Sequence, residues 1–187
     1  EATSLILHDS ARVQAQDLVR TNRKRERAGD PPLEPLYSTA EVERFLPLFR
    51  PVAYDEFVPV APGIRARWVE AGHLLGSASI QLLVEDDGSR QTIVFSGDLG
   101  RQDAPLLKDA AGFQQGDVVV LESTYGGHDH KPLPDTLAEF ESLVKTAVER
   151  KSKILIPTFA VGRAQLLLYL LAVMFRQKLV PPFPIYI

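Results

Sequence analysis

The chain has no cysteine among its 187 residues. Disulfides and thiolate-ligated zinc sites are therefore excluded, so a bound metal would have to be held by histidine and carboxylate side chains. The first residues, EATSLILHDS, lack the charged start, the apolar core and the cleavage site of a signal peptide. The longest apolar run, LLLYLLAVMF (Leu166–Phe175), has about half of the ~20 residues that a membrane-spanning helix needs, which favours a buried helix.

An excess of charge of one sign is also missing. The formal net charge is -3, with 45% hydrophobic and 24% charged residues, as in ordinary globular domains. Because nucleic-acid-binding domains are usually basic overall, this composition does not indicate a general nucleic-acid binder, although a local basic patch stays open. The chain starts without Met and stops at FPIYI, a strand-like run with nothing after it. We therefore expect a fragment of a longer protein.

The first part of the chain predicts two helices joined by a proline-rich connector. A helix is expected from His8 to about Gly29, since apolar residues recur at helical spacing and a glycine stands at its end. The connector is DPPLEPLYST (residues 30–39), and Ser38 or Thr39 is expected to cap a short second helix.

From Val52 to about Val120 the pattern predicts strands. GIRARWVEAG alternates, and its two faces hold Ile64, Ala66 and Trp68 on one side and Arg65 and Arg67 on the other. SIQLLVED and RQTIVFSGD predict a hairpin joined by the turn DDGS. DVVVLES is a continuous apolar run, which is typical of a strand buried on both faces.

The remaining residues predict alternating helices and strands. T-x-x-E at Thr136–Glu139 indicates a capping box at the start of a helix. KILIPTF predicts a short buried strand, Gly162–Lys178 an apolar helix, and Ile185–Ile187 the beginning of another strand. We therefore expect an α/β fold in which an antiparallel half precedes a parallel β-α-β-α-β half.

Two glycine-rich turns carry residues that could bind a metal. His73 lies between Gly72 and Gly76 after one strand, and Asp98 follows another strand in FSGDLG. Taken alone, the histidine is more often structural or exposed, and the aspartate a turn or cap residue. Ligands at the ends of two strands of a hairpin can lie side by side, however, and a set made only of histidine and carboxylate suits zinc or manganese.

Other histidines and one carboxylate are weaker candidates. Glu122, in the stretch LESTYGG at the end of the third apolar strand, could contact a neighbouring histidine or be a satisfied turn acceptor. His128 and His130 have ligand-like spacing but stand in a polar stretch that predicts an exposed loop. His8 is expected to make a local hydrogen bond at a helix start.

A basic stripe falls on one face of the first predicted helix. It is formed by Arg20, Arg23 or Lys24, and Arg27. A solvated helix end is the ordinary interpretation of such a stripe. If the substrate is a polyanion, these side chains are the obvious place for phosphate contacts that do not depend on sequence.

The order of the motifs resembles that of a known enzyme family. LHDSARVQ, NRKRERAGDPPLEPLYS, GHLLGSAS, FSGDLGR, LESTYGG and IPTFAVGRAQLLLYLL follow one another as in the β-CASP branch of the metallo-β-lactamase-fold nucleases. The resemblance runs from His8 to the last residue. It implies residues 1–125 as part of the metallo-β-lactamase αββα sandwich and residues 126–187 as the start of an α/β β-CASP cap domain.

The same resemblance implies roles for single residues. His73 matches a histidine that holds one zinc, and Asp98 matches the aspartate that bridges two zinc ions in a complete site. Glu122 matches an acidic residue that orients a catalytic histidine, so Asp98 and Glu122 are the implied catalytic residues. The family's main ligand motif, HxHxDH, would precede this segment, and its later histidines would follow Ile187. This chain alone is thus expected to bind zinc poorly and to cleave nothing.

The implied function is zinc-dependent hydrolysis of RNA in the cytoplasm, by exonuclease or endonuclease action, with RNA as partner and no membrane. The implied RNA-binding residues are Arg20, Arg23, Lys24 and Arg27. The protein would act as a homodimer or with other processing factors. The alternatives are a DNA-processing nuclease of the family, a small-molecule hydrolase such as a thioesterase, and a non-catalytic homologue that binds RNA or a nuclease. The ESTYGG and IPTFAVGRAQ stretches argue against the small-molecule hydrolase, which would lack the cap.

Overall fold

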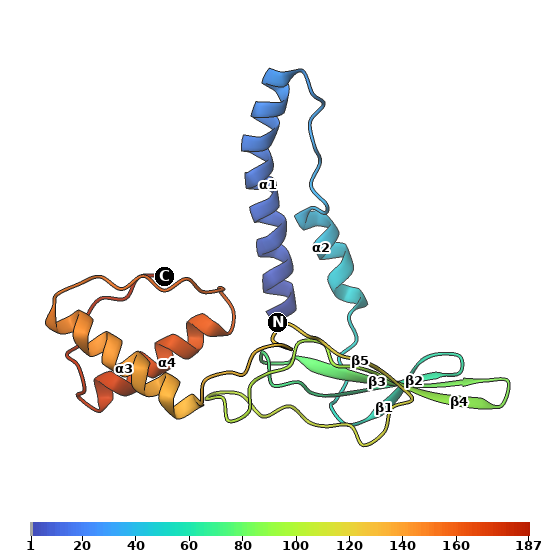
Figure 1. The fold of residues 1–187 in the computed structure, drawn as a ribbon. Coiled ribbons are helices and arrows are strands. Elements are labelled where there is room, and N and C mark those ends of the chain that lie inside the picture. The colour runs from blue at the N-terminus through green and yellow to red at the C-terminus, as the bar shows by residue number, and fades with distance from the viewer. Residues whose placement is uncertain (1) are drawn as a thin grey trace. The chain divides into compact units, whose positions relative to one another are not determined.

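The computed structural model describes residues 2–187, which divide into two compact units after Pro51. The first unit holds helices and the second a sheet followed by helices (Figure 1). Among the described residues, no helix is both long enough and apolar enough to cross a membrane.

The first unit is built on a long helix, α1 (Ala2–Ala28). It begins earlier than the predicted start at His8, because residues 2–7 contain neither glycine nor proline and extend the helix. Its end is as predicted. Gly29 has φ +79°, and the amide of Asp30 donates to the carbonyl of Arg25 at 2.9 Å, as in a Schellman motif.

The second helix is fixed by its capping residues. α2 (Thr39–Phe45) is followed by a short 3₁₀ helix, η1 (Leu46–Leu48). Ser38 is the N-cap: its hydroxyl accepts from the amide of Glu41 at 3.3 Å, and the Glu41 carboxylate accepts from the Ser38 amide at 2.7 Å. This reciprocal pair confirms the predicted cap at Ser38 and satisfies amides that a helix start leaves unpaired.

The second unit contains a mixed five-stranded sheet in the order β1-β2-β3-β4-β5. Its strands are β1 (Phe57–Ala61), β2 (Ile64–Glu70), β3 (Ala78–Asp86), β4 (Ser89–Phe95) and β5 (Val118–Val120). The first four pair antiparallel, and β5 pairs parallel to β4. The α/β fold class and the antiparallel first half are thus confirmed.

The predicted hairpin and the alternation along β2 are both present. Asp87 and Gly88 form the turn between β3 and β4 with φ +42° and +78°, the backbone that a two-residue type I′ turn requires. Arg67 lies opposite Gln81 across β2 and β3, and Trp68 lies opposite Ile80 on the other face. The two faces of β2 therefore separate the arginines from the apolar residues, as predicted.

Three strand predictions for the second half are wrong in whole or in part. β5 forms, but it lies exposed at the edge of the sheet, with Val119 59% exposed, because β4 is its one strand partner in the described chain. Residues 153–159 and 185–187 form no strand, and Leu155 is 95% exposed. An apolar run becomes a strand only where a neighbour accepts and donates its backbone hydrogen bonds, and residues 2–187 provide none there. The predicted parallel β-α-β-α-β half is therefore absent from residues 2–187.

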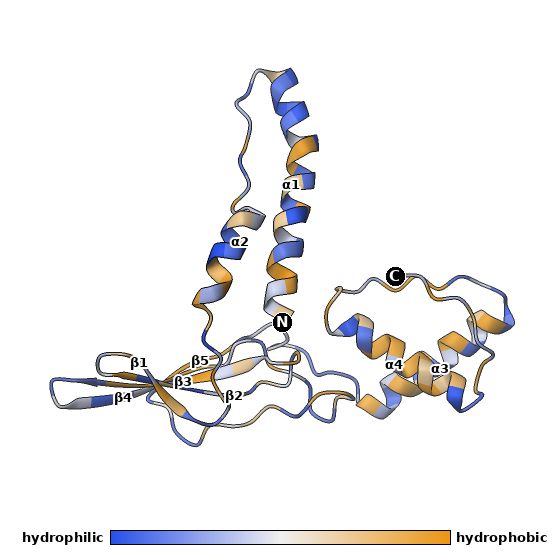
Figure 2. Ribbon diagram, turned by 180° about the vertical axis from the view of Figure 1, so that it is seen from behind, coloured by the Kyte–Doolittle hydropathy of each residue, from blue (hydrophilic) through white to orange (hydrophobic). Residues whose placement is uncertain are grey.

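Two helices complete the second unit, α3 (Leu133–Glu149) and α4 (Arg163–Arg176). Their side chains form one core with the segment after α4; its buried members are Val144, Leu171, Met174 and Val180. Figure 2 shows large parts of both helices in the hydrophobic colour. The apolar helix predicted at 162–178 is confirmed.

The predicted capping box at Thr136 is wrong. The helix α3 already starts at Leu133, with Pro134 in its first turn, where proline needs no amide hydrogen. Thr136 is thus inside the helix, and its hydroxyl donates to the carbonyl of Pro132 at 3.1 Å. Glu139 instead pairs with Lys131.

Candidate functional site

The turns that carry His73 and Asp98 are joined backbone to backbone. The amide of Gly100 donates to the carbonyl of Ala71 at 2.8 Å. A Cβ on Gly100 would lie 2.7 Å from the His73 amide nitrogen and closer still to the carbonyl of Gly72. Only glycine leaves room for this approach, so the two turns contact each other because residue 100 has no side chain.

The His73 turn is held by one serine. The Ser77 hydroxyl accepts from the amides of both His73 and Leu74, each at 3.1 Å, and the Ser77 amide donates to the Leu74 carbonyl at 3.0 Å. These bonds close the turn without using the His73 imidazole. The imidazole is therefore left free to face solvent from the end of β2.

The Asp98 turn is held by a hydrogen-bond network that runs from the buried Ser79 and Ser96 to Glu122. The Ser79 hydroxyl donates to the Ser96 carbonyl at 2.6 Å, and the Ser96 hydroxyl donates to the Gly97 carbonyl at 2.7 Å. The Ser96 hydroxyl also accepts from the Glu122 amide at 2.9 Å. The Glu122 carboxylate in turn accepts from the Leu99 amide at 2.6 Å. Both flanks of Asp98 are thus fixed while its own carboxylate makes none of these bonds.

These two turns bring His73 and Asp98 together. The Nε2 atom of His73 lies 3.8 Å from an Oδ2 atom of Asp98, and the side chains are 42% and 75% exposed. Two ligands of one zinc ion, each about 2.0–2.2 Å from it, can have such a separation, so the pair fits a metal in chemistry and in spacing. Within residues 2–187 no group of three or more histidine, cysteine or acidic residues could hold a metal. The pair is therefore a partial ligand set.

Glu122 lies beside this pair. The Leu99 amide, the Thr124 hydroxyl and the charge of nearby His73 all lower the pKa of the Glu122 carboxyl, so it is ionised at neutral pH. An ionised carboxylate accepts hydrogen bonds at both oxygens and donates none. In this chain Glu122 thus acts as an acceptor that holds the Asp98 turn.

The other histidines lie outside the site. His128 and His130 stand in an exposed loop, as predicted, and the ring of His130 packs edge-on against Tyr125 at 4.5 Å. His8 makes hydrogen bonds, as predicted, although it lies inside α1 and not at its start. Its Nδ1 lies 2.8 Å from the Ser4 carbonyl and its Nε2 lies 2.7 Å from the Glu43 carboxylate.

Several residues that shape the site were not singled out from the sequence. Ser77, Ser79, Ser96 and Gly100 all stand within or beside the GHLLGSAS and FSGDLGR stretches. Serine next to glycine in a turn is a signal for side-chain hydrogen bonds to the backbone. That signal does not say which amide is bound, since the bonds reach across two different turns.

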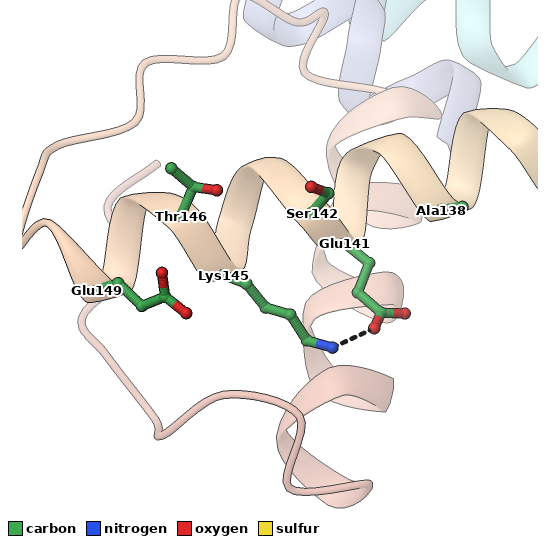
Figure 3. A pocket seen from close by; sticks show the side chains of 6 residues that line it. All are labelled: Ala138, Glu141, Ser142, Lys145, Thr146 and Glu149. Atoms are coloured by element: carbon green, nitrogen blue, oxygen red, sulfur yellow. Dashed lines mark hydrogen bonds and ion pairs between the residues drawn. The ribbon is translucent and has the colours of Figure 1, made fainter.

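Two of the hollows among the described residues lie in the second unit. One, of about 370 Å³, lies between the sheet and residues 110–116, and Ser96 and Leu99 on either side of Asp98 contribute to its wall. The other, of about 420 Å³, lies on α3 (Figure 3). It is lined by Ala138, Glu141, Ser142, Lys145, Thr146 and Glu149. The Lys145–Glu141 ion pair of 2.5 Å occupies it, and none of these residues belongs to the predicted site.

The basic stripe lies exposed on α1 of the first unit. Arg20, Arg23, Lys24 and Arg27 are all exposed and form no ion pair within 4.0 Å among the described residues. The connector uses a different face of the helix. There, Asn22 both accepts from the Leu33 amide at 2.8 Å and donates to the Leu33 carbonyl at 2.9 Å.

Arg20 and Arg27 are seven residues apart and share a face, and Asn22 stands about 200° around the helix from Arg20. The connector thus leaves the stripe open to solvent.

Comparison with curated proteins gives a consistent set of relatives. A ribonuclease of Thermus thermophilus is 38% identical over 138 residues, which cover 74% of this chain and 31% of the relative. The transcription termination factor FttA of Methanothermobacter thermautotrophicus is 41% identical over 138 residues, 72% of this chain and 21% of the relative. No protein-family profile matches the chain.

A eukaryotic protein belongs to the same set. Subunit 3 of the cleavage and polyadenylation specificity factor of Dictyostelium discoideum is 37% identical over 137 residues, 73% of this chain and 17% of the relative. The chain thus spans less than a third of the length of these three relatives. With the fold and the motif order, these similarities place the chain, over the part that matches, in the β-CASP branch of the metallo-β-lactamase-fold nucleases.

Proposed function

We propose that this chain is part of a metal-dependent ribonuclease that hydrolyses phosphodiester bonds of RNA. The observation that carries the proposal is the approach of His73 and Asp98 to 3.8 Å, at the ends of strands that glycine turns hold together. The names of the relatives support RNA as the substrate, since they include a ribonuclease and a cleavage and polyadenylation factor. On this proposal, residues 1–125 belong to the nuclease core, residues 126–187 begin the cap domain, and the protein acts in the cytoplasm.

His73 and Asp98 are proposed as metal ligands, with Asp98 shared between two zinc ions. When bound, such ions supply a hydroxide at neutral pH and neutralise charge at phosphorus. The remaining ligands would come from residues outside this sequence, because the described residues supply only the pair. The chain by itself is therefore proposed to bind metal weakly and to be inactive.

The chain's own residues hold the proposed metal ligands in position. The Asp98 carboxylate receives no hydrogen bond among the described residues, so its oxygens are available to a metal, and the Ser96 and Glu122 bonds fix the backbone on both sides of it. Glu122 is proposed to support the reaction through this turn, and through orientation of a histidine beyond the chain. Ligands whose supporting bonds are lost typically lose about 10–100-fold in metal affinity or activity.

The stripe of Arg20, Arg23, Lys24 and Arg27 is proposed to contact the phosphates of RNA. These side chains are exposed and free of carboxylate partners among the described residues, so they can bind phosphates without first breaking an ion pair. Such contacts give affinity with little base preference. The protein is further proposed to act as a homodimer or with other processing factors.

The first test is metal content. Zinc per chain is measured by elemental analysis on this polypeptide and on Asp98→Ala, and we expect little zinc in both. About one zinc per chain that is lost in Asp98→Ala would mean that the chain completes a site alone, and would contradict the partial ligand set.

The second test is cleavage of labelled RNA by the longer protein that contains this segment. Asp98→Asn should abolish cleavage while RNA binding persists, whereas Asp86→Asn, an exposed carboxylate at the end of β3, should leave cleavage unchanged. Equal activity of the two variants would refute the assignment of Asp98.

A further inference from the structure

Two guanidinium groups on β2 have no carboxylate partner among the described residues. Arg65 and Arg67 form no ion pair within 4.0 Å in the described chain. The carboxylate nearest to them on the neighbouring strand β3 is that of Glu85, which pairs with Arg90. Residues two apart on a strand share a face and lie about 6.6 Å apart. Arg65 is exposed and Arg67 is half-buried, so the two residues place two positive charges side by side on one face of the sheet.

Aromatic rings lie next to both cations. The guanidinium carbons of Arg65 and Arg67 are 5.3 and 5.0 Å from the centre of the Phe57 ring, and that of Arg67 is 5.8 Å from the Phe113 ring. These distances are within the range of a cation–π contact. A buried amide, Gln81, accepts from Arg67 Nη2 at 2.7 Å. Arg67 is therefore held in place without having its charge neutralised.

One donor of this group is unused. The Nε atom of Arg67 is buried and has no hydrogen-bond partner among the described residues. Because arginine stays protonated, this nitrogen is always a donor, and a buried donor without an acceptor is unfavourable. Phe113, whose ring contacts the Arg67 guanidinium, belongs to residues 110–116, which form neither helix nor strand. Arg67 Nε is thus a donor that could serve an acceptor outside the described residues.

We propose that Arg65 and Arg67, with Phe57 and Phe113, form a second contact site for single-stranded RNA, separate from the α1 stripe and from the His73–Asp98 pair. Phosphate oxygens would bind the guanidinium groups and a base would stack on an aromatic ring, the combination that single-strand binding surfaces use. The site rests on the proposed function, which makes RNA the substrate. Arg67 lies about 10 Å along β2 from Glu70, where the His73 turn begins. RNA bound here would therefore be close to the proposed cleavage site.

An acidic polypeptide offers the same anionic oxygens, but it brings no flat base for the rings. RNA is for this reason the favoured ligand, and the test separates the two. The full 187-residue chain is titrated into a fluorescein-labelled oligouridylate of about 20 nucleotides, and binding is followed by fluorescence anisotropy at several salt concentrations. The variants are Arg65→Gln, Arg67→Lys and the matched control Arg90→Gln, an exposed arginine of β4 with the same charge change.

We expect Arg65→Gln to weaken binding about fivefold and to reduce the salt slope by about 0.7, as the loss of one phosphate contact to a single strand does. Arg67→Lys keeps the charge but loses the planar fork, and should weaken binding about threefold. Arg90→Gln should change affinity less than twofold. Unchanged fluorescence of Trp68, the single tryptophan, shows that a variant retains the sheet.

Three results would overturn the site. Equal losses for Arg65→Gln and Arg90→Gln would mean that only net charge matters. Displacement of the RNA by polyglutamate of matched charge, at equal concentration, would mean that the surface binds acidic polypeptides. Absence of RNA binding by the chain would also refute it. In that case, cleavage by the longer protein and its loss in Asp98→Asn would still decide the proposed function independently.

Discussion

Replacing Gly100 with alanine tests whether His73 and Asp98 meet because two turns can touch. The new Cβ would lie 2.7 Å from the His73 amide nitrogen, where real Cβ atoms essentially never come closer than 3.0 Å, and nearer still to the Gly72 carbonyl. Both neighbours are backbone atoms, so neither can rotate away as a side chain would. Overpacking costs about 1–3 kcal/mol even where side chains can adjust. We expect Gly100→Ala to lower the free energy of unfolding by about 3 kcal/mol.

The matched control is Gly112→Ala. Nothing lies within 4 Å of a Cβ at this position, and its φ is not in the left-handed region. Alanine there should be neutral, or stabilising by up to about 1 kcal/mol, because it restricts the unfolded chain. Urea unfolding followed by the fluorescence of Trp68 reports on the sheet directly, since this is the chain's one tryptophan and lies in β2.

For a domain of this size, about 3 kcal/mol corresponds to roughly 6–12 °C in Tm. If Gly100→Ala and Gly112→Ala unfold at the same urea concentration, the turns do not need to touch, and Gly100 does not set the distance between His73 and Asp98. If Gly100→Ala is destabilised as expected, the longer protein carrying it should also lose RNA cleavage when assayed well below its Tm.

Three further predictions concern other parts of the fold. Both ring nitrogens of His8 face acceptors, the Ser4 carbonyl and the Glu43 carboxylate. These contacts raise the pKa of His8, and the Ser4 carbonyl has the larger effect. Protonated His8 should therefore stabilise the packing of α1 against α2 fully below pH ~6.5, the usual histidine pKa. This stabilisation should be lost as the pH rises through the higher pKa that His8 has in the folded protein. Amide exchange in α2 that does not change with pH would refute this. Ser38→Ala removes the cap of α2 and should cost about 1 kcal/mol, seen as faster amide exchange in α2, with no change contradicting the cap. Val144 is 1% exposed in the α3–α4 core, so Val144→Ala should lower the free energy of unfolding by about 2 kcal/mol. Its neighbour Leu143 is 62% exposed, and Leu143→Ala should lower it by less than about 0.5 kcal/mol. Chemical denaturation followed by circular dichroism measures both, and equal losses would show that Val144 is not a core residue.

The local signals in the sequence determined the elements that depend on near neighbours. Ser38 with Glu41 fixes the start of α2, Gly29 fixes the end of α1, and Asp87–Gly88 fixes the β3–β4 hairpin. Each of these features is made by backbone and side-chain bonds within a few residues, so spacing alone predicts it. The motif order likewise indicated the family, which the relatives confirm.

The same local rules failed where the outcome depended on distant partners. KILIPTF reads as a buried strand, but a strand needs a neighbour, and none of the described strands pairs with it. Val118–Val120 forms a strand yet stays exposed, because apolar character does not specify what covers a sheet edge. T-x-x-E at Thr136 matches a capping box, but the helix begins earlier, with Pro134 in its first turn, so Thr136 lies inside the helix.

The candidate site divides in the same way. Sequence pattern alone selected His73, Asp98 and Glu122 as residues with suitable chemistry at strand ends. Only the tertiary structure decided that His73 and Asp98 lie 3.8 Å apart and that Glu122 holds the Leu99 amide. The physical reason is that these contacts join turns separated by more than twenty residues. Their distance is set by strand register and by the missing side chain of Gly100, neither of which a local pattern records.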